Sequence, residues 1–154
     1  MRIRFLLSLL LSAPPALAES PRAAMFPNQT SCYLRQYSQA HLAGHPDQRV
    51  RQIALGPSDA PGRDLVLRVA VSLRGLQERF VADAYCENTG GSLSCGLEGD
   101  GGWFTLTPAK QGVKMKVGRE PLGFEGETGF VSFGGGASDD DVFLIPPVAA
   151  EACP

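Results

Sequence analysis

Four cysteines, Cys32, Cys86, Cys95 and Cys153, constrain the fold of this chain more than any other feature of its sequence. An even number of cysteines in an exported domain indicates two disulfides, and four cysteines allow three connectivities. A redox or metal-binding role for the thiols has little support, because no Cys-x-x-Cys motif is present and both histidines lie far away in sequence. The cysteines therefore predict a small domain held by covalent cross-links.

One of the three connectivities has geometric support. Gly90-Gly91 suits the centre of a two-residue hairpin turn, because glycine accepts the positive φ that such turns require. Counting outward from this turn places Cys86 opposite Cys95 at a non-hydrogen-bonded pair, where Cα atoms lie about 4.5 Å apart and a disulfide can form. Cys32 and Cys153 then remain, and their bond would join the beginning of the domain to its end.

The N-terminal residues indicate that the chain is exported into an oxidising compartment. A basic head at residues 1–4 precedes an apolar run over residues 5–11, and a small-x-small cleavage site ends at Ala18. These are the parts of a secretory signal peptide, so we predict a signal peptide over residues 1–18 and a periplasmic or secreted product. No membrane span is expected, because the apolar run is far shorter than the roughly 20 residues that a bilayer requires.

Length and charge narrow the class of protein further. Removal of the signal peptide from the 154-residue chain leaves 12 basic and 16 acidic side chains, a balance of −4. A chain of this size forms one domain. Its mild acidity argues against nucleic acid as a partner, since nucleic acid needs basic surface for affinity. We expect an envelope macromolecule or a small ligand instead; the sequence does not set the oligomeric state.

Alternating apolar residues predict an all-β fold, a single antiparallel β-sandwich or small β-barrel of about seven or eight short strands. Residues 19–31 show little periodicity and are predicted to be a flexible leader before the disulfide-stapled domain, residues 32–154. A short helix is expected only near Ser38, which can cap a single turn that Gly44 and Pro46 prevent from continuing. The predicted strands are Arg49–Leu55, Leu65–Arg74, Phe80–Cys86, Leu93–Leu97, Trp103–Thr107, Val113–Val117, Phe130–Phe133 and Val142–Ile145.

His41 and His45 are the only histidines, and they are the candidate metal ligands. A spacing of four presents two imidazoles to one metal ion when both lie on a helix. Gly44 between them argues against a continuous helix, and only Asp47 offers a third ligand nearby. The alternative is that both rings bond loop carbonyls or lie in solvent. Arg49 and Arg51, in the same stretch, also make a small anion a candidate ligand.

Acidic residues gather after a run of three glycines, in Asp139-Asp140-Asp141. Clustered carboxylates on a glycine-rich loop can bind Ca²⁺, but their spacing does not match a twelve-residue calcium loop. Aspartate is common in turns before strands because its side chain bonds the local backbone. We therefore interpret this cluster, and the Glu98–Gly102 segment, as turn chemistry.

Catalytic motifs are lacking. Paired cysteines cannot act as nucleophiles, no Gly-x-Ser-x-Gly motif occurs, and the glycine run is not followed by the Lys-Ser/Thr of a phosphate loop. No catalytic residue and no cofactor is therefore predicted. A hydrolase with paired carboxylates stays open as an alternative, because such a pair is defined by its spatial separation and not by sequence.

Trp103 is the only tryptophan and is followed by Phe104 on a predicted strand. Successive side chains of a strand point to opposite faces, so one of the two rings should face the core and the other should face outward. An outward tryptophan can anchor a binding partner. The alternative is that the indole packs in the core or at its rim.

Two stretches, Tyr37–Val50 and Asp100–Phe104, resemble segments of small exported bacterial proteins of unassigned function. The resemblance extends over most of the mature chain and implies a periplasmic location. It implies no activity and no catalytic residue. It raises the expectation that His41 and His45 belong to a shared structural motif.

Three functions from different classes follow from the sequence. The first is a non-catalytic envelope module that binds a macromolecule or small ligand, a class that includes inhibitors of lysozyme or protease type; this rests on analogy of fold. The second is a metal- or anion-binding accessory protein that uses His41 and His45. The third is a small hydrolase with paired carboxylates. The first is our leading prediction; the sequence favours a binding protein over an enzyme and leaves that choice open.

Overall fold

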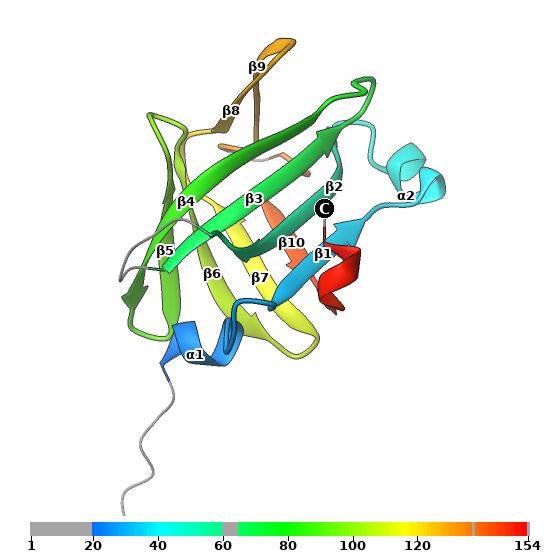
Figure 1. The fold of residues 1–154 in the computed structure, drawn as a ribbon. Helices are drawn as coiled ribbons and strands as arrows, with labels where there is room; N and C mark the ends of the chain where they lie inside the picture. Colours follow the sequence, from blue (N-terminus) through cyan, green and yellow to red (C-terminus); the bar gives the residue numbers. More distant parts are fainter. Residues whose placement is uncertain (1–19, 60–64, 137, 154) are drawn as a thin grey trace, which may run out of the picture.

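The computed structural model describes residues 20–59, 65–136 and 138–153, so the predicted signal peptide, residues 1–18, lies outside the described part of the chain. Strands dominate these ranges (Figure 1). In chain order the elements are α1 (Pro21–Met25), β1 (Cys32–Gln36), α2 (Gln39–Gly44), β2 (Val50–Pro57), β3 (Leu65–Leu73), β4 (Arg79–Thr89), β5 (Ser92–Leu97), β6 (Trp103–Ala109), β7 (Gly112–Val117), β8 (Leu122–Gly126), β9 (Gly129–Phe133), β10 (Val142–Ile145), β11 (Pro147–Val148) and the 3-10 helix η1 (Ala150–Ala152).

The main sheet closes on itself. Within the described residues nine strands form one antiparallel sheet, in the order β10-β7-β6-β5-β4-β3-β2-β1-β11. The two terminal strands of this order, β10 and β11, are successive parts of one segment that is interrupted at Pro146. The Leu34 N–H donates to the Pro146 carbonyl over 3.0 Å, so this segment contacts β7 with its first half and β1 with its second. The all-β prediction is confirmed, and the closed sheet has a barrel-like form (Figure 1).

The hairpin between β4 and β5 has the predicted register. Gly90 has a φ of 60°, and Cys86 lies directly opposite Cys95, with 4.1 Å between the Cα atoms of the bonded pair. The second disulfide joins Cys32 on β1 to Cys153 after η1, across a sequence separation of 121. Closing a loop of this length stabilises a domain by about 4–5 kcal/mol on the chain-entropy model. Both predicted disulfides are confirmed.

Side chains from strands β1 to β10 fill one apolar core. The period of two decides which side chains enter it: on β6 the ring of Phe104 is fully buried, whereas Trp103 beside it faces outward and keeps 45% of its surface exposed. The largest fully buried side chains are Phe80, Phe104, Phe124, Phe143, Met25, Ile53, Leu55, Leu67, Leu73, Leu93, Leu106 and Met115.

Helix α1 packs against one end of the barrel, near β5 and β6 (Figure 1). Ser20 caps the helix by accepting the Ala23 N–H, and Met25 and Phe26 are buried in the core. The Tyr33 hydroxyl donates to the Met25 carbonyl and ties the helix to β1. The structure thus differs from the flexible leader predicted for residues 19–31, because the two apolar residues after Pro21 find space at the barrel end.

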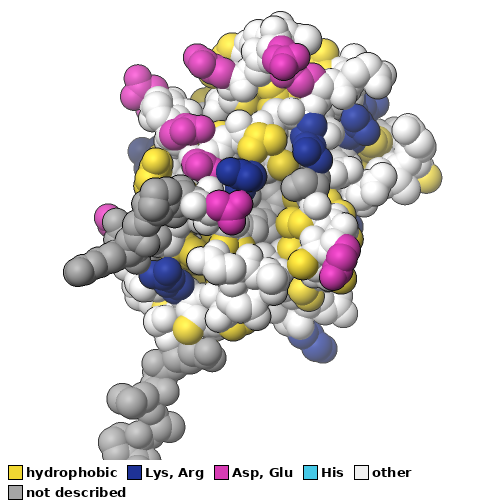
Figure 2. All heavy atoms as spheres, viewed as in Figure 1, with side chains coloured by type: hydrophobic (Ala, Val, Ile, Leu, Met, Phe, Trp, Pro, Cys, Tyr) yellow, Lys and Arg dark blue, Asp and Glu magenta, His cyan; other side chains and the backbone are white. Residues whose placement is uncertain are grey.

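The hairpin β8–β9 packs at the opposite end of the barrel, beside β4 (Figure 1). Leu122, Phe124 and Phe133 face the core from this hairpin. Glu78, in the turn between β3 and β4, accepts the N–H groups of Glu127 and Thr128 over 2.6 and 3.0 Å and so holds the hairpin tip. Hydrogen bonds from Thr128 lower the pKa of Glu78. Figure 2 shows acidic side chains gathered at this end of the molecule.

Five elements were not predicted from the sequence: α1, β1, β8, β11 and η1. The short helix capped by Ser38 is confirmed as α2, where Ser38 accepts the His41 N–H. None of the helices in the described residues is long and apolar enough to cross a membrane.

Candidate functional site

The loop that joins β1 to β2, residues 37–49, carries the predicted metal ligands, and we call it the histidine loop. The imidazoles of His41 and His45 stack with 4.1 Å between ring centroids and an interplanar angle of 15°. Tyr37 extends the stack, 4.7 Å from His41, and the Arg35 guanidinium lies 5.1 Å from the centre of the Tyr37 ring. The structure therefore brings the two histidines together, but as a column of rings lying face to face.

The ring nitrogens of this column have partners within the loop. His41 Nε2 lies 2.9 Å from Gln48 Oε1, and His45 Nδ1 lies 2.8 Å from the His41 carbonyl. The structure describes no group of three or more His, Cys, Asp or Glu side chains that could hold a metal ion. The observed contacts give these histidines a structural role in the loop; metal binding stays a prediction.

Two side chains from outside, those of Arg74 and Asp140, brace the histidine loop. The Arg74 guanidinium, from the end of β3, donates to the carbonyls of Leu42, His45 and Gln48 over 3.1–3.2 Å. Arg49, one of the candidate anion-binding residues, donates to the Ser132 carbonyl on β9. These cations are therefore engaged with carbonyl oxygens of the protein.

Asp140 is the second brace and the only acidic residue among the described ones with a buried side chain, 1% exposed. It accepts the backbone N–H groups of Arg49 and Val50 over 2.7 and 3.1 Å and so fixes the start of β2. Burial raises the pKa of the Asp140 carboxyl, and the two backbone donors offset only part of that effect.

Asp141 is hydrogen-bonded to the backbone of its own loop. Its carboxylate accepts the N–H groups of Ser138 over 2.9 Å and Gly136 over 3.3 Å. Desolvation alone would raise the pKa of Asp141, but the backbone donors of Ser138, Gly136 and Gly135 together outweigh it and lower the pKa. Hydrogen bonds of this kind are the turn chemistry that the sequence predicted for the cluster, with Asp140 and Asp141 in different roles.

A hydrolase with paired carboxylates requires two acidic side chains in one hollow. Asp83 and Glu98 line one shallow hollow together with Arg68 and Arg79. Glu98 accepts the Asp83 N–H over 3.2 Å, and the Asp83 carboxylate lies 3.7 Å from Arg68 Nε. Both carboxylates thus have partners on an open surface. No arrangement here assigns them the roles of acid and base, and the hydrolase stays an untested alternative.

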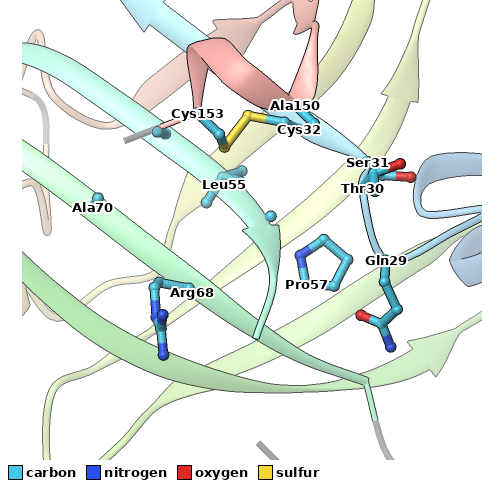
Figure 3. Close-up of a pocket in the computed structure, with 12 residues that line it drawn as sticks. Gln29, Thr30, Ser31, Cys32, Leu55, Pro57, Arg68, Ala70, Ala150 and Cys153 are labelled. Carbon is cyan, nitrogen blue, oxygen red and sulfur yellow. A yellow bond between two sulfur atoms is a disulfide. The ribbon is translucent and has the colours of Figure 1, made fainter. Parts of the chain in front are cut away.

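A second hollow lies over β1, β2 and β3, where the outward residues Ala54, Gly56 and Ala70 are small. Figure 3 shows the Cys32–Cys153 disulfide along one wall and Arg68 on the other side. Its polar side chains are largely occupied: Arg68 faces Asp83, and the Thr30 hydroxyl donates to Asn28 over 2.7 Å. The hollow therefore offers an incoming ligand few free polar groups.

The surface around Trp103 differs from all of these. Trp103 lies next to Gly118, whose N–H donates to the Trp103 carbonyl over 2.9 Å. A methyl group added at Gly118 would lie 2.6–2.9 Å from three indole atoms, Cε2, Nε1 and Cδ2. All three atoms belong to the five-membered ring of the indole, and a point this close to each of them lies over the ring face, so that face rests on Gly118. The opposite face is therefore turned outward from the barrel.

Cationic and hydroxyl groups surround this indole, and we call the hollow the Trp103 cleft; it is lined by Trp103, Thr105, Lys116, Val117, Gly118, Arg119, Gly136 and Asp141. Lys116 and Arg119 are exposed. Across the described residues neither side chain makes an ion pair or a hydrogen bond to the protein. The one lining acid is Asp141, whose oxygens are occupied by donors of its own loop.

Sequence reasoning identified Trp103 as an anchor candidate but missed Lys116, Gly118 and Arg119. The alternation over Val113–Val117 predicts that Lys116 faces outward on a strand that pairs with the one carrying Trp103. In the structure Lys116 lies opposite Thr105, two residues from Trp103. That signal could have placed one cation near the indole; the contact with Gly118 needs three-dimensional coordinates.

No known protein family, curated protein or solved structure matches the chain.

Proposed function

We propose that this chain is an exported, non-catalytic binding module of the cell envelope, and that the Trp103 cleft is its binding surface. The observation that carries the proposal is the flat, outward-facing indole of Trp103 beside the free cations of Lys116 and Arg119. Tryptophan and arginine are the residues most enriched among those that dominate binding energy.

The rigidity of the support favours binding at this surface. Trp103 is the first residue of β6, a strand that pairs with β5 on one side and β7 on the other. The loop behind the cleft is fixed by Asp141 through its bonds to Gly136 and Ser138. A surface that is already ordered loses less conformational entropy when a partner binds, so more of the contact energy appears as affinity.

The distribution of engaged groups supports binding over catalysis. General acid–base chemistry needs a titratable group within reach of a substrate, and Asp140, the one described carboxyl group whose pKa is raised, is buried against backbone donors. The groups left free in the Trp103 cleft are cations, a hydroxyl and a ring face. These groups bind and orient a ligand.

Retention of envelope components on the immobilised mature protein tests the proposal. Wild type and the His41→Ala/His45→Ala variant should retain the same stoichiometric component, whereas Trp103→Ala should lose it. Trp103→Ala should keep the wild-type free energy of unfolding within about 0.5 kcal/mol, because the change is confined to the surface, whereas the histidine variant should lose stability and still retain the component. Equal retention by Trp103→Ala, or loss of retention in the histidine variant alone, would contradict the assignment of the surface.

A further inference from the structure

We infer that the Trp103 cleft binds an oligosaccharide whose sugar rings carry carboxylates, as uronic acids do. The inference rests on the proposed function and names the ligand class of that same surface. Three features of the cleft carry it: an open aromatic face, uncompensated cations beside that face, and a row of hydroxyl groups along the sheet.

The aromatic face selects a flat, partly apolar ligand. One side of the Trp103 indole is covered by Gly118, and the other is open. The face of an aromatic ring carries a partial negative charge. The C–H bonds on one side of a sugar ring present a weakly positive, apolar surface, so they stack on such a face while the hydroxyl groups at the ring edge stay available for hydrogen bonds.

The cations select a carboxylate. Two cations, Lys116 and Arg119, face one anion, Asp141, so the lining side chains carry a net charge of +1 within a chain that is acidic overall. The guanidinium group pairs with a carboxylate through two parallel hydrogen bonds, which fixes orientation as well as charge. The acidic end formed by β8 and β9 (Figure 2) would repel the same ligand, so the charge pattern favours the cleft.

The outer surface beside Trp103 continues with groups that suit a longer saccharide. Thr105, which lines the cleft, lies opposite Ser94 on β5, and both hydroxyls can donate and accept hydrogen bonds. In the next row Trp103 lies opposite Gly96, and Gly96 lies opposite Tyr85, whose side chain is 56% exposed. Two strand spacings, about 9.5 Å, separate the two aromatic residues, and a Cβ at Gly96 would meet nothing. A second sugar ring can therefore reach Tyr85.

Nucleic acid, which also stacks on aromatic rings, fits these observations less well. Its affinity comes mainly from many phosphate contacts with Lys and Arg. The cleft offers two cations, and the chain carries more acidic than basic side chains. A short carboxylated saccharide needs only these two cations.

Fluorescence titration of the mature protein tests the inference, because Trp103 is the only tryptophan and its emission reports on this surface alone. The probe is trigalacturonic acid, compared with its methyl ester, which has the same rings without the charges. We expect a saturable change with the acid and binding of the ester weaker by about tenfold or more. Lys116→Gln/Arg119→Gln should lower affinity for the acid to that for the ester, whereas Lys114→Gln, on the same strand outside the cleft, should leave it unchanged.

Three results would overturn the inference: no saturable change with the acid, equal affinity for the acid and the ester, or tighter binding of an acidic peptide of matched charge. Calorimetry of Trp103→Ala with the acid checks that binding occurs at the indole. If the saccharide fails while the immobilised protein still retains an envelope component through Trp103, the ligand class is wrong and the proposed function stands. If both fail, the surface itself is wrong.

Discussion

The histidine loop and the Trp103 cleft carry similar side chains but use them differently. Both combine aromatic rings with cations. In the histidine loop the cation Arg74 donates to three carbonyls of the loop, and the rings of His41 and His45 cover each other. In the Trp103 cleft the ring lies against a glycine, and the cations make no ion pair or hydrogen bond with the rest of the described protein.

This difference separates stability from binding. A polar group that is hydrogen-bonded inside the protein contributes to folding, because its removal leaves its partners without bonds. A polar group without a partner contributes little to folding and is available for a ligand. Substitutions in the histidine loop should therefore lower the free energy of unfolding and spare binding, while substitutions in the Trp103 cleft should do the reverse.

The largest expected effect on stability is that of Asp140→Ala. The backbone N–H groups of Arg49 and Val50 would lose their acceptor in a buried site. We expect a loss of about 2 kcal/mol in the free energy of unfolding, measured by urea denaturation, with affinity at the Trp103 cleft unchanged. A variant of wild-type stability would show that the buried carboxylate does not brace the histidine loop.

Arg74→Ala should have a smaller effect, about 1 kcal/mol, because the carbonyls it leaves free lie on a partly exposed loop and can bind water. Hydrogen exchange should become faster over residues 42–48 and stay unchanged over β6 and β7. Faster exchange in β6 would show that the histidine loop and the Trp103 cleft are coupled.

Trp103→Ala is the matched substitution in the Trp103 cleft. Because the indole contacts Gly118 from outside and fills no part of the core, its loss should change the free energy of unfolding by only about 0.5 kcal/mol. Retention of the envelope component should nevertheless be lost. A large loss of stability together with loss of binding would mean that the indole is structural.

The smallest expected effect is a pH dependence of the free energy of unfolding. The pKa of Asp140 is raised in the folded protein, so the unfolded chain loses this proton at a lower pH than the folded one. Between the ordinary aspartate pKa, about 4, and the raised value, the contribution of Asp140 to stability should fall as pH rises, and it should be constant above that window. Urea denaturation across this range should show that the free energy of unfolding of wild type falls with rising pH relative to that of Asp140→Asn. A slope of opposite sign would contradict the burial of an uncompensated carboxylate.

Most of the strands and the Cys86–Cys95 disulfide could be predicted because they depend on local rules, and the Cys32–Cys153 disulfide followed by elimination. The alternation over Leu65–Leu73 and the Gly90-Gly91 turn each specify a geometry from neighbouring residues, and the register of Cys86 with Cys95 follows from that turn. Strand β8 could not be predicted in this way. Its sequence Leu-Gly-Phe-Glu-Gly has too few apolar residues to show a period, and Phe124 is buried only because the hairpin folds over the barrel end.

The candidate site was predictable only in part. The alternation placed Trp103 and Phe104 on opposite faces, which the structure confirms. The positions of Gly118 and Arg119 beside Trp103 depend on the turn after β7, which no local pattern fixes. Helix α1 was missed for a similar reason: Met25 is buried because the barrel end provides a partner, and the sequence of residues 19–31 has no period that reveals it.

Two glycine-to-alanine substitutions test whether the flat indole of the Trp103 cleft, and not the histidine loop, is the binding surface. Gly118→Ala adds a methyl group that collides with the indole, whereas Gly44→Ala adds the same group to the histidine loop in open space. Neither glycine has a positive φ, so alanine causes no backbone strain at either position. The measurement is the dissociation constant for trigalacturonic acid. We expect Gly118→Ala to weaken the affinity for trigalacturonic acid about tenfold and Gly44→Ala to leave it unchanged. An unchanged dissociation constant for Gly118→Ala, or a loss of affinity confined to Gly44→Ala, would show that the indole face is not the binding surface.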